Sequence, residues 1–593
     1  MPLSRIRGRL GSAAQRFMAR VTSPGFIAAV AAPAGAAALT LYFVVPTVAP
    51  GVASWDTAEF QTVGPVLGTA HPTGYPAYVI LGWLASIVLA PFGDPAYRMN
   101  LLQALFAALA IAGTVGIVQV LTGRRLIAMA TGLALACTQL FWRLSTHADP
   151  HMFHVALVAI LFVVLLVWDQ RRHSEDADEV ARADRWLVGA AFVYGVAVAN
   201  HSLALLLPPA IAIFVLVADW RVILRWRTIV ACAVVLIGTI AIFFSELPIR
   251  AAMNAPLVYG HPDTWSGFQY VVLAEQFRGS LQDPFGDLPV KAGHVIDLMA
   301  GWLGPFGQLA VLGIGTSLIR RPRFVILGGL AAVATCIFSA SYANADIERY
   351  YLVPLLLAYT LAGLAAADVV NLIAWFLDEI ELTLPGRRRA SAEDEAEPGA
   401  KAGEPAAPVG RGRARPSAGS GRPIRPPRLP GFAWVALVCE IAVAGAILFS
   451  TVGVVPQRQQ PINSATGAVS EAGNNGSEAW VRAILAPANQ GGLPANAVIM
   501  AWWSDSTRLW YGQKVLGLRP DIYVVDDRTR LDANLGEVQD VFNKYLGNRP
   551  LYTIRLSGGI DGLDELGREY DMQSIVLGSG VGITQVIRRK GSQ

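Results

Sequence analysis

The sequence GVASWDTAEFQTVGPVLGTAHPTGYPAY, residues 51–78, decides the interpretation of the whole chain. It directly follows an apolar stretch, and it carries two carboxylates, a histidine and several turn-forming residues. Asp56 and Glu59 are three residues apart, so a helical turn places both on one face. Two acids on one face of a helix at a membrane boundary are costly to desolvate. The spacing therefore predicts a pair for acid/base catalysis or metal binding, although a well-capped interfacial loop has the same pattern.

The segment HPTGYP, residues 71–76, predicts a rigid backbone beside that pair. Pro72 and Pro76 restrict their own backbone angles and those of the residues before them, whereas Gly74 allows unusual dihedral angles. A lone loop histidine usually has only a local hydrogen-bond partner. Within this restricted segment, His71 is a candidate site residue.

The composition excludes an ordinary soluble protein. Of 593 residues, 54% are hydrophobic and only 15% are charged, and the mean hydropathy is +0.45. Several apolar runs approach or exceed the roughly 18 residues that a membrane-spanning helix needs. The four cysteines lie within apolar runs and lack the spacing of a zinc or redox motif. The chain is therefore predicted to be a polytopic α-helical membrane protein.

About eleven apolar runs are candidate spans. The first follows a basic N-terminus, and its length favours an uncleaved helix over a signal peptide. Residues 77–90 are expected to form an additional interfacial or membrane-dipping helix. The predicted spans are residues 25–48, 99–121, 126–142, 152–168, 186–200, 203–218, 228–246, 295–318, 323–340, 351–376 and 432–455.

The distribution of charge assigns the loops to two sides. Five alternate loops are rich in Arg and fall on the same side as the basic N-terminus, which the positive-inside rule assigns to the cytoplasm. They are residues 124–125, 169–185, 219–227, 320–323 and 386–428. The complementary loops hold nearly every histidine and most acids close to a span. They are residues 51–76, 145–151, 200–201, 247–294 and 341–351. This sorting predicts one extracytoplasmic active site built from several loops.

The chain is expected to have five parts. These are a basic cytoplasmic N-terminus (1–24), a transmembrane catalytic core (25–384) with its first extracytoplasmic loop at 49–98, a disordered Pro- and Arg-rich cytoplasmic linker (385–430), a last transmembrane helix (431–455) and an extracytoplasmic α/β domain (456–593). In the last part, AVIMAWW and DIYVVDD are typical of strands, and VQDVFNKYL is typical of an amphipathic helix. The strand, helix, strand order predicts a partly parallel sheet. The absence of a glycine-rich phosphate loop or nucleophile elbow favours a binding or supporting role for this domain.

The string WDTAEFQTVGPVLGTAHPTGYPAYVILGWL and the following AYRMNLLQALFAALA resemble the signature of a large bacterial family of polytopic membrane proteins. That family is related to the animal transmembrane O-mannosyltransferases and to the C-type glycosyltransferase superfamily, which uses lipid-linked sugars. The similarity continues in GVAVANHSLALLLPP (195–209), LPIRAAMNAPLVYGHPDTWSGFQYVV (247–272), IERYYLVP (347–354) and LRPDIYVVD (518–526). ADPHMFH (148–154) departs from it, because the family more usually has an Ala-Glu-Val-Tyr pattern there.

The resemblance implies a C-type glycosyltransferase-like fold with an acidic residue in the first extracytoplasmic loop, beside a pocket for a polyprenyl-phosphate sugar. Asp56 is then the expected general base, with Glu59 positioning the acceptor or the base. Phosphate leaving from an oxocarbenium-like carbon calls for Arg or His. The candidates for that role are Arg250, Arg349, His71 and His201, and Asp149 and Glu348 are secondary candidates near the acceptor.

Each phosphate candidate outside the first loop has a simpler structural explanation. Arg250 follows a span, where an arginine often extends to lipid headgroups. Arg349 is adjacent to Glu348 and is a candidate salt-bridge partner for it. His201 follows Asn200 at a predicted helix end, where capping is the more common role.

The expected reaction transfers a sugar, mannose by the resemblance, from a polyprenyl-phosphate donor to an extracytoplasmic acceptor such as Ser or Thr hydroxyls of an exported protein. No cofactor is required, because no pyrophosphate is held, although a divalent cation bridging Asp56 and a second acid stays open. The expected partners are the donor, a protein or glycan/lipid acceptor and membrane lipids, without nucleic acid. The expected location is the plasma membrane, with a cytoplasmic N-terminus.

Three alternatives remain. The same fold can act on a lipid or polysaccharide acceptor, because the acceptor is set by loop shape. A transporter or flippase of a lipid-linked solute is a second, but transporters usually place charges near the midplane and have internal repeats. A non-catalytic scaffold is a third.

Overall fold

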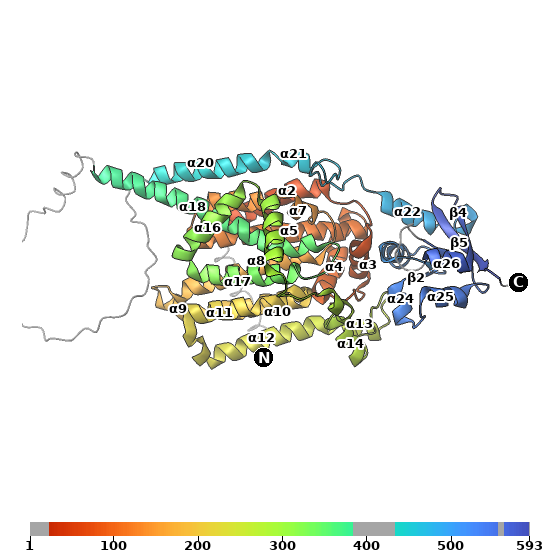
Figure 1. The fold of residues 1–593 in the computed structure, drawn as a ribbon. Coiled ribbons are helices and arrows are strands. Elements are labelled where there is room, and N and C mark those ends of the chain that lie inside the picture. Colours follow the sequence, from red (N-terminus) through yellow and green to blue (C-terminus); the bar gives the residue numbers. More distant parts are fainter. Residues whose placement is uncertain (1–22, 384–432, 555–562, 592–593) are drawn as a thin grey trace, which may run out of the picture.

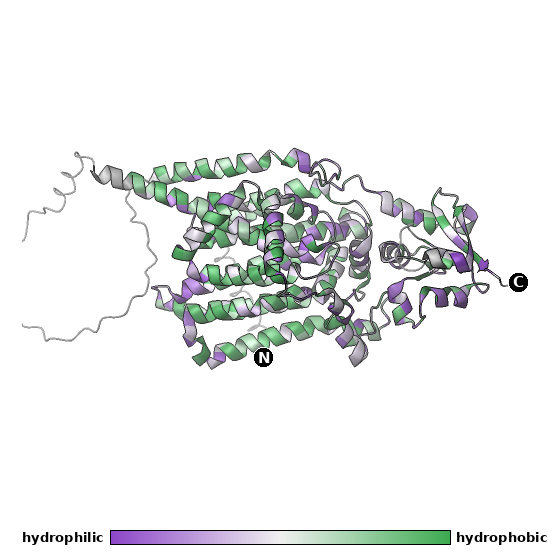
Figure 2. Ribbon diagram, viewed as in Figure 1, coloured by the Kyte–Doolittle hydropathy of each residue, from purple (hydrophilic) through white to green (hydrophobic). Residues whose placement is uncertain are grey.

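The computed structural model describes residues 23–383, 433–554 and 563–591. The linker predicted at 385–430, and all but the last two residues of the predicted N-terminal tail, lie outside these ranges. A bundle of long helices carries a smaller C-terminal domain at one end (Figure 1). Hydrophobic residues dominate the long helices, and hydrophilic residues gather in the C-terminal domain and in the short helices at the ends of the bundle (Figure 2).

Seven helical segments of the described chain are long and apolar enough to cross a membrane, or eight if one bent pair counts as a single span. The protein is therefore a multi-pass membrane protein. The seven are built on α2 (Pro24–Val44), α5 (Pro95–Thr122), α8 (Pro150–Arg172), α12 (Trp226–Phe244), α17 (Pro322–Ser339), α18 (Leu352–Thr383) and α20 (Ala433–Val452).

The prediction of about eleven spans is corrected by this count. The run at 295–318 is the bent pair, α15 (Leu288–Leu303) and α16 (Phe306–Arg320), whose axes differ by 116°. Gly304 has a φ of +51° and is followed by Pro305, which explains the break. Three further predicted spans are helices of 12, 17 and 12 residues, too short for the same criterion. They are α6 (Arg125–Ala136), α10 (Asp184–Asn200) and α11 (Pro208–Asp219).

The short helices of the bundle position its loops. The run at 77–90 forms α4 (Pro76–Val88), a short apolar helix, as expected for a segment that does not span. The remaining short helices are α3 (Trp55–Val66), α7 (Gln139–Arg143), α9 (Ala177–Arg182), α13 (Glu246–Ala252), α14 (Trp265–Val272) and α21 (Val455–Arg458).

The centre of the bundle is the packing of α5 against α8. Gly113 of α5 faces Ala159 of α8 so closely that a Cβ on Gly113 would lie 2.5 Å from the Cβ of Ala159. Small residues let membrane helices approach in this way. Because α7 and a short loop lead directly into α8, the close packing also fixes where Asp149, the residue before α8, lies.

The C-terminal domain contains a five-stranded sheet in the order β2-β1-β3-β5-β4. Strand β1 is parallel to both of its neighbours, β2 and β3, while β5 is antiparallel to β3 and β4. The predicted partly parallel sheet is thus confirmed, and a β4–β5 hairpin extends it. The strands are β1 (Val498–Met500), β2 (Tyr523–Val525), β3 (Leu551–Thr553), β4 (Tyr570–Val576) and β5 (Gly582–Arg589); the helices are α22 (Gly476–Ile484), α23 (Trp503–Trp510), α24 (Asp527–Asp532), α25 (Val538–Tyr545) and α26 (Leu563–Glu569).

The C-terminal domain contacts the bundle directly. Helix α23 packs on α3. The hydroxyl of Tyr511 accepts a hydrogen bond from the backbone N–H of Ala96 at 3.1 Å. Arg528 donates to the carbonyl of Val258, and its guanidinium lies 4.4 Å from the ring centroid of Tyr259. The domain is therefore part of one end of the bundle.

The arginine-rich loops within the described ranges lie at the opposite end. Helix α5 begins beside Tyr511 and ends at Thr122, and its 28 residues cover about 42 Å. Beyond that end, Arg124 pairs with Glu440 of α20 at 3.3 Å. The separation of basic loops from the other loops, inferred from the sequence, is thus a separation between the two ends of the bundle.

Candidate functional site

Asp56 and Glu59 lie on α3 but have different partners. Oδ2 of Asp56 accepts a hydrogen bond from Arg349 at 2.9 Å. Glu59 is fully buried and accepts from the backbone N–H of His71 at 2.9 Å and from its ring Nδ1. Asp56 therefore contacts the guanidinium, and Glu59 holds the HPTGYP segment in place.

Arg349 joins two carboxylates that are distant in sequence. Its Nη2 donates to Asp56, and its Nη1 donates to Oδ2 of Asp149 at 3.0 Å. Arg349 lies on a 3₁₀ turn at residues Ile347–Tyr351, directly before α18. The site thus assembles from the first turn of α3, the N-terminus of α8 and the turn before α18.

Asp149 is the N-cap of α8. Its Oδ1 accepts a hydrogen bond from the backbone N–H of His151 at 2.7 Å, and the ring Nδ1 of His151 lies 2.8 Å from the same oxygen. Aspartate is favoured at this position because it satisfies a free N–H of the first turn. The departure at ADPHMFH therefore keeps an acid at the site.

Electrostatics keep these groups ionised. Burial opposes the charge on Asp56, but the charges of His71 and Arg349 outweigh it and hold the pKa of Asp56 below its usual value. Burial also opposes the charge on Asp149, yet His151 and Arg349 hold its pKa well below the usual range. Although burial opposes a charge on His71, the Glu59 carboxylate raises the pKa of His71 above its ordinary value.

Trp503 is a site residue that the sequence did not reveal. It begins α23 of the C-terminal domain, and its indole N–H donates to Oδ1 of Asp56 at 2.9 Å. Its ring also meets the ring of His71 edge to face, with centroids 5.9 Å apart. The only sequence signal was the pair of tryptophans that ends AVIMAWW, within a domain expected to have a supporting role.

Arg250 and Glu348 have partners outside this network. Arg250 donates to the backbone carbonyls of Leu67 at 2.7 Å and Val66 at 3.2 Å, which caps the C-terminus of α3. Glu348 is half-exposed and pairs with Arg143 at 2.7 Å, so it is not the partner of its neighbour Arg349.

His201 belongs to a group of buried rings next to the network. Its ring centroid lies 4.4 Å from that of His151 and 5.4 Å from that of Tyr75. The Tyr75 hydroxyl is 3.2 Å from Nε2 of His71. These rings therefore connect the HPTGYP segment to the start of α8.

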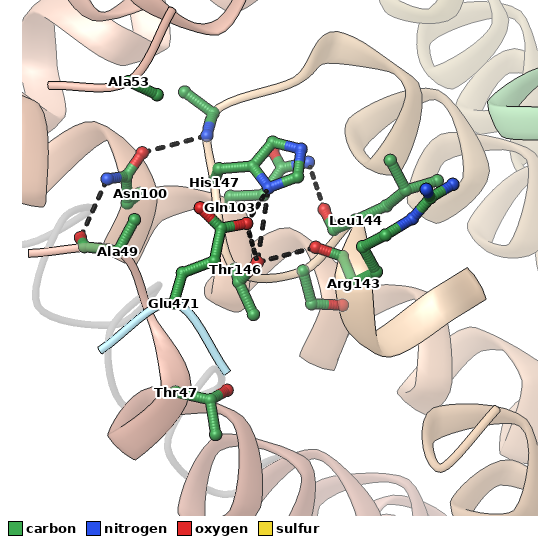
Figure 3. Close-up of polar contacts among 12 residues, drawn as sticks. Thr47, Ala49, Ala53, Asn100, Gln103, Arg143, Leu144, Thr146, His147 and Glu471 are labelled. Atoms are coloured by element: carbon green, nitrogen blue, oxygen red, sulfur yellow. Dashed lines mark hydrogen bonds and ion pairs between the residues drawn. The ribbon is translucent and has the colours of Figure 1, made fainter. Parts of the chain in front are cut away.

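A second polar cluster supports the loop that leads to Asp149 (Figure 3). Glu471, from the segment after α21, accepts from Thr146 at 3.1 Å and lies 2.9 Å from Nδ1 of His147. Asn100 of α5 accepts from the backbone N–H of Ala148 at 2.9 Å (Figure 3). The loop is thus fixed by α5 on one side and by the C-terminal part of the chain on the other.

No group of three or more His, Cys, Asp or Glu side chains is arranged to hold a metal ion within the described ranges. The Arg349 guanidinium bridges Asp56 and Asp149.

Comparison with known proteins agrees with the sequence resemblance. Residues 56–224 match the family model of the protein O-mannosyl-transferase TMEM260 N-terminal domain. The mouse protein O-mannosyl-transferase TMEM260 is 31% identical over 157 residues, which are 26% of this chain and 21% of the mouse protein. The chain thus matches only about a fifth of the length of this curated relative.

The fold extends the similarity over nearly the whole chain. The structure of ArnT from Cupriavidus metallidurans bound to undecaprenyl phosphate covers 93% of this chain and 96% of ArnT, with a TM-score of 0.52 and 14% identity. The apo structure of the same ArnT gives a TM-score of 0.53 at 15% identity and the same coverage. Residues 56–224 are therefore similar to the N-terminal domain of the TMEM260 family of protein O-mannosyl-transferases, within a chain that has the fold of ArnT.

Proposed function

We propose that this chain is an integral-membrane glycosyltransferase that moves a sugar from a polyprenyl-phosphate donor to a hydroxyl acceptor. The network Asp56–Arg349–Asp149 is the observation that carries the proposal. It combines an ionised base, Asp56, with a buried cation, Arg349, at one end of a membrane bundle. Asp56 and Asp149 both lie in the segment that is similar to TMEM260. The similar ArnT fold supports a lipid-phosphate donor, because ArnT binds undecaprenyl phosphate.

The proposed chemistry divides the work among the residues in contact. Asp56 accepts the proton of the acceptor hydroxyl while that oxygen attacks the anomeric carbon. The bond between that carbon and the phosphate oxygen breaks, and the leaving phosphate keeps the electron pair. Arg349 and His71, with its raised pKa, stabilise the charge that develops on the phosphate.

The other predicted residues support this centre. Glu59 orients His71, and Asp149 orients Arg349. Arg250 holds the C-terminus of α3 and so the start of the HPTGYP segment. Arg349 retains an Nε–H without a hydrogen-bond partner among the described residues, which leaves a donor for the phosphate.

The site end is proposed to be extracytoplasmic, with the N-terminus in the cytoplasm of a plasma-membrane protein. The Arg-rich loops at the far end of α5 support this orientation. Because the charged network lies at an end of the bundle beside the C-terminal domain, and not at mid-depth, enzymatic transfer is favoured over transport.

The name of the mouse relative favours mannose as the sugar and protein hydroxyls as the acceptor. The test is transfer of label from polyprenyl-phosphate mannose by the purified full-length chain, offered exported peptides and envelope lipids together. Label in peptide that is lost in Asp56→Asn supports the complete proposal. Label in lipid changes the acceptor, and bound donor without transfer to any acceptor contradicts the reaction.

A further inference from the structure

Two buried imidazoles beside the proposed catalytic network lack partners for one nitrogen each. His151 and His201 are 2% and 3% exposed, and their ring planes are tilted by 58°. Nε2 of each ring is buried and has no hydrogen-bond partner among the described residues. Leaving such groups unsatisfied is costly, so a buried pair of this kind calls for a ligand.

The partners of the other two nitrogens define the tautomers. The backbone N–H of Leu203 donates to Nδ1 of His201 at 3.1 Å, so that nitrogen carries no proton and Nε2 carries the N–H. Nδ1 of His151 lies 2.8 Å from the Asp149 carboxylate, which accepts its proton, so Nε2 of the neutral ring has a lone pair. The two free nitrogens are therefore one donor and one acceptor.

A hydroxyl group offers both the acceptor and the donor that these two nitrogens lack. Its oxygen accepts from Nε2–H of His201, and its proton is donated to Nε2 of His151. An ionised phosphate oxygen has no proton for His151, so it satisfies only one of the two. The pair therefore fits a hydroxyl better than it fits the phosphate assigned to His201 from the sequence.

The surroundings connect this pair to the reacting groups. Asp149 contacts both His151 and Arg349, and Arg349 contacts Asp56. The ring of Tyr350 contacts both histidines, with its centroid 4.6 Å from that of His151 and 6.0 Å from that of His201. Two side chains, those of Asp149 and Arg349, thus connect His151 to the proposed base Asp56.

We propose that His151 and His201 form a subsite that binds one hydroxyl of the sugar being transferred and so selects the sugar. The inference rests on the proposed function, because it takes the ligand to be the donor sugar. A water molecule offers the same chemistry, and the experiment distinguishes the two.

The experiment measures binding, so it does not depend on turnover. Full-length protein in detergent is titrated by calorimetry with short-chain prenyl-phosphate mannose and its 2-, 3-, 4- and 6-deoxy analogues. The series is repeated with prenyl-phosphate glucose and with prenyl phosphate alone. We expect one deoxy position to weaken binding about 10- to 100-fold, as for loss of a well-made hydrogen bond.

The variants identify the residues responsible. In His201→Phe, which removes the N–H, the intact donor should bind as weakly as the critical deoxy analogue, and the difference between them should disappear. His201→Gln keeps an N–H donor and should retain part of the difference. Trp502 belongs to the C-terminal domain and is not part of the proposed subsite. Trp502→Phe should therefore leave the wild-type pattern of affinities intact.

The possible failures separate this inference from the proposed function. Three results overturn the subsite and leave the pair holding only water. They are equal binding of all deoxy analogues, no binding of any sugar donor, and a loss of affinity on deoxygenation that neither histidine variant changes. Equal weakening of prenyl phosphate alone by His201→Phe overturns it in favour of phosphate. A selective hydroxyl effect without sugar transfer contradicts the enzyme but keeps the subsite.

Discussion

Trp503 and Asp56 are 447 positions apart in sequence, and the indole N–H of Trp503 donates to Oδ1 of Asp56 at 2.9 Å. The other carboxylate oxygen accepts from Arg349. The orientation of Asp56 is therefore set from two sides, by the bundle and by the C-terminal domain. In the proposed reaction, Trp503 is a positioning residue for the base.

Replacing Trp503 with Phe should reduce kcat about tenfold or more, because a hydrogen bond to a charged group is lost. That hydrogen bond is one of the contacts that lower the pKa of Asp56. Without it, Asp56 takes up a proton at higher pH. The acidic limb of the pH–rate profile should therefore move to higher pH, which a purely structural defect would not cause.

The control for this variant is Trp502→Phe, which changes the neighbouring tryptophan and leaves the bond to Asp56 intact. Its profile should match the wild type. An unchanged acidic limb in Trp503→Phe, together with an unchanged rate, would contradict the positioning role.

Asp56→Asn should lower the rate of sugar transfer by about 10²- to 10⁴-fold, the usual contribution of a general base. The amide is close in shape to the carboxylate, so the protein should stay folded in the membrane, as size-exclusion chromatography in detergent can check. Glu275→Gln removes an acid that pairs with exposed Arg278 three residues away, and it serves as the control. A rate within a few-fold of wild type would exclude Asp56 as the base.

Arg349→Ala leaves the carboxylates of Asp56 and Asp149 facing each other without the guanidinium. Removing one partner of a buried ion pair typically costs about 3–5 kcal/mol, so the melting temperature in detergent should fall clearly. Arg349→Lys keeps the positive charge but lacks the planar guanidinium that binds both acids. Compared with Arg349→Ala, it should therefore restore the melting temperature more fully than the affinity for the donor. Full recovery of donor binding by lysine would show that charge alone is sufficient.

The Glu471–His147 contact should make stability depend on pH. Glu471 raises the pKa of His147 despite burial, and His147 lowers the pKa of Glu471. The histidine contribution is complete below its ordinary value of 6.5 and is lost as the pH rises through the raised pKa. The glutamate contribution is present above its ordinary value of 4.5 and is lost as the pH falls through the lowered pKa.

The stabilising effect of this pair should therefore be largest between these two ordinary values. Melting temperatures of wild type and Glu471→Gln, measured from pH 5 to pH 9, should differ most at pH 5–6 and converge at high pH. His294→Gln, at an exposed position of α15, provides the matched histidine control. A difference that stays constant with pH would mean that the contact acts only through packing.

The sequence was sufficient for the parts of the fold and site that depend on local pattern. Patterns among neighbouring residues predicted the WDTAEF and HPTGYP segments, the sorting of the basic loops and the strands of the last domain. The motif IERYYLVP predicted Arg349 as a site residue. The resemblance to the TMEM260 type of O-mannosyltransferase is confirmed for residues 56–224.

Contacts between distant segments were not predictable in this way. Trp503 and Glu471 reach the site only because the C-terminal part docks on α3 and on the loop before α8, and no local pattern encodes that docking. The spacing predicted that Asp56 and Glu59 share one helix, but it did not reveal that Glu59 bonds His71. The span count was too high because three apolar runs form helices of only 12, 17 and 12 residues. In a fourth run, hydropathy alone did not reveal the interruption at Gly304 and Pro305.

The late position of Trp503 has a consequence for biosynthesis. Asp56 leaves the ribosome near the start of translation, and Trp503 leaves it only after all the candidate membrane helices of the described ranges have been made. The membrane bundle is thus inserted before the base acquires its indole partner. A truncated or stalled chain carries Asp56, Arg349 and Asp149 without Trp503, so the protein gains its complete site only once its last domain has folded and docked.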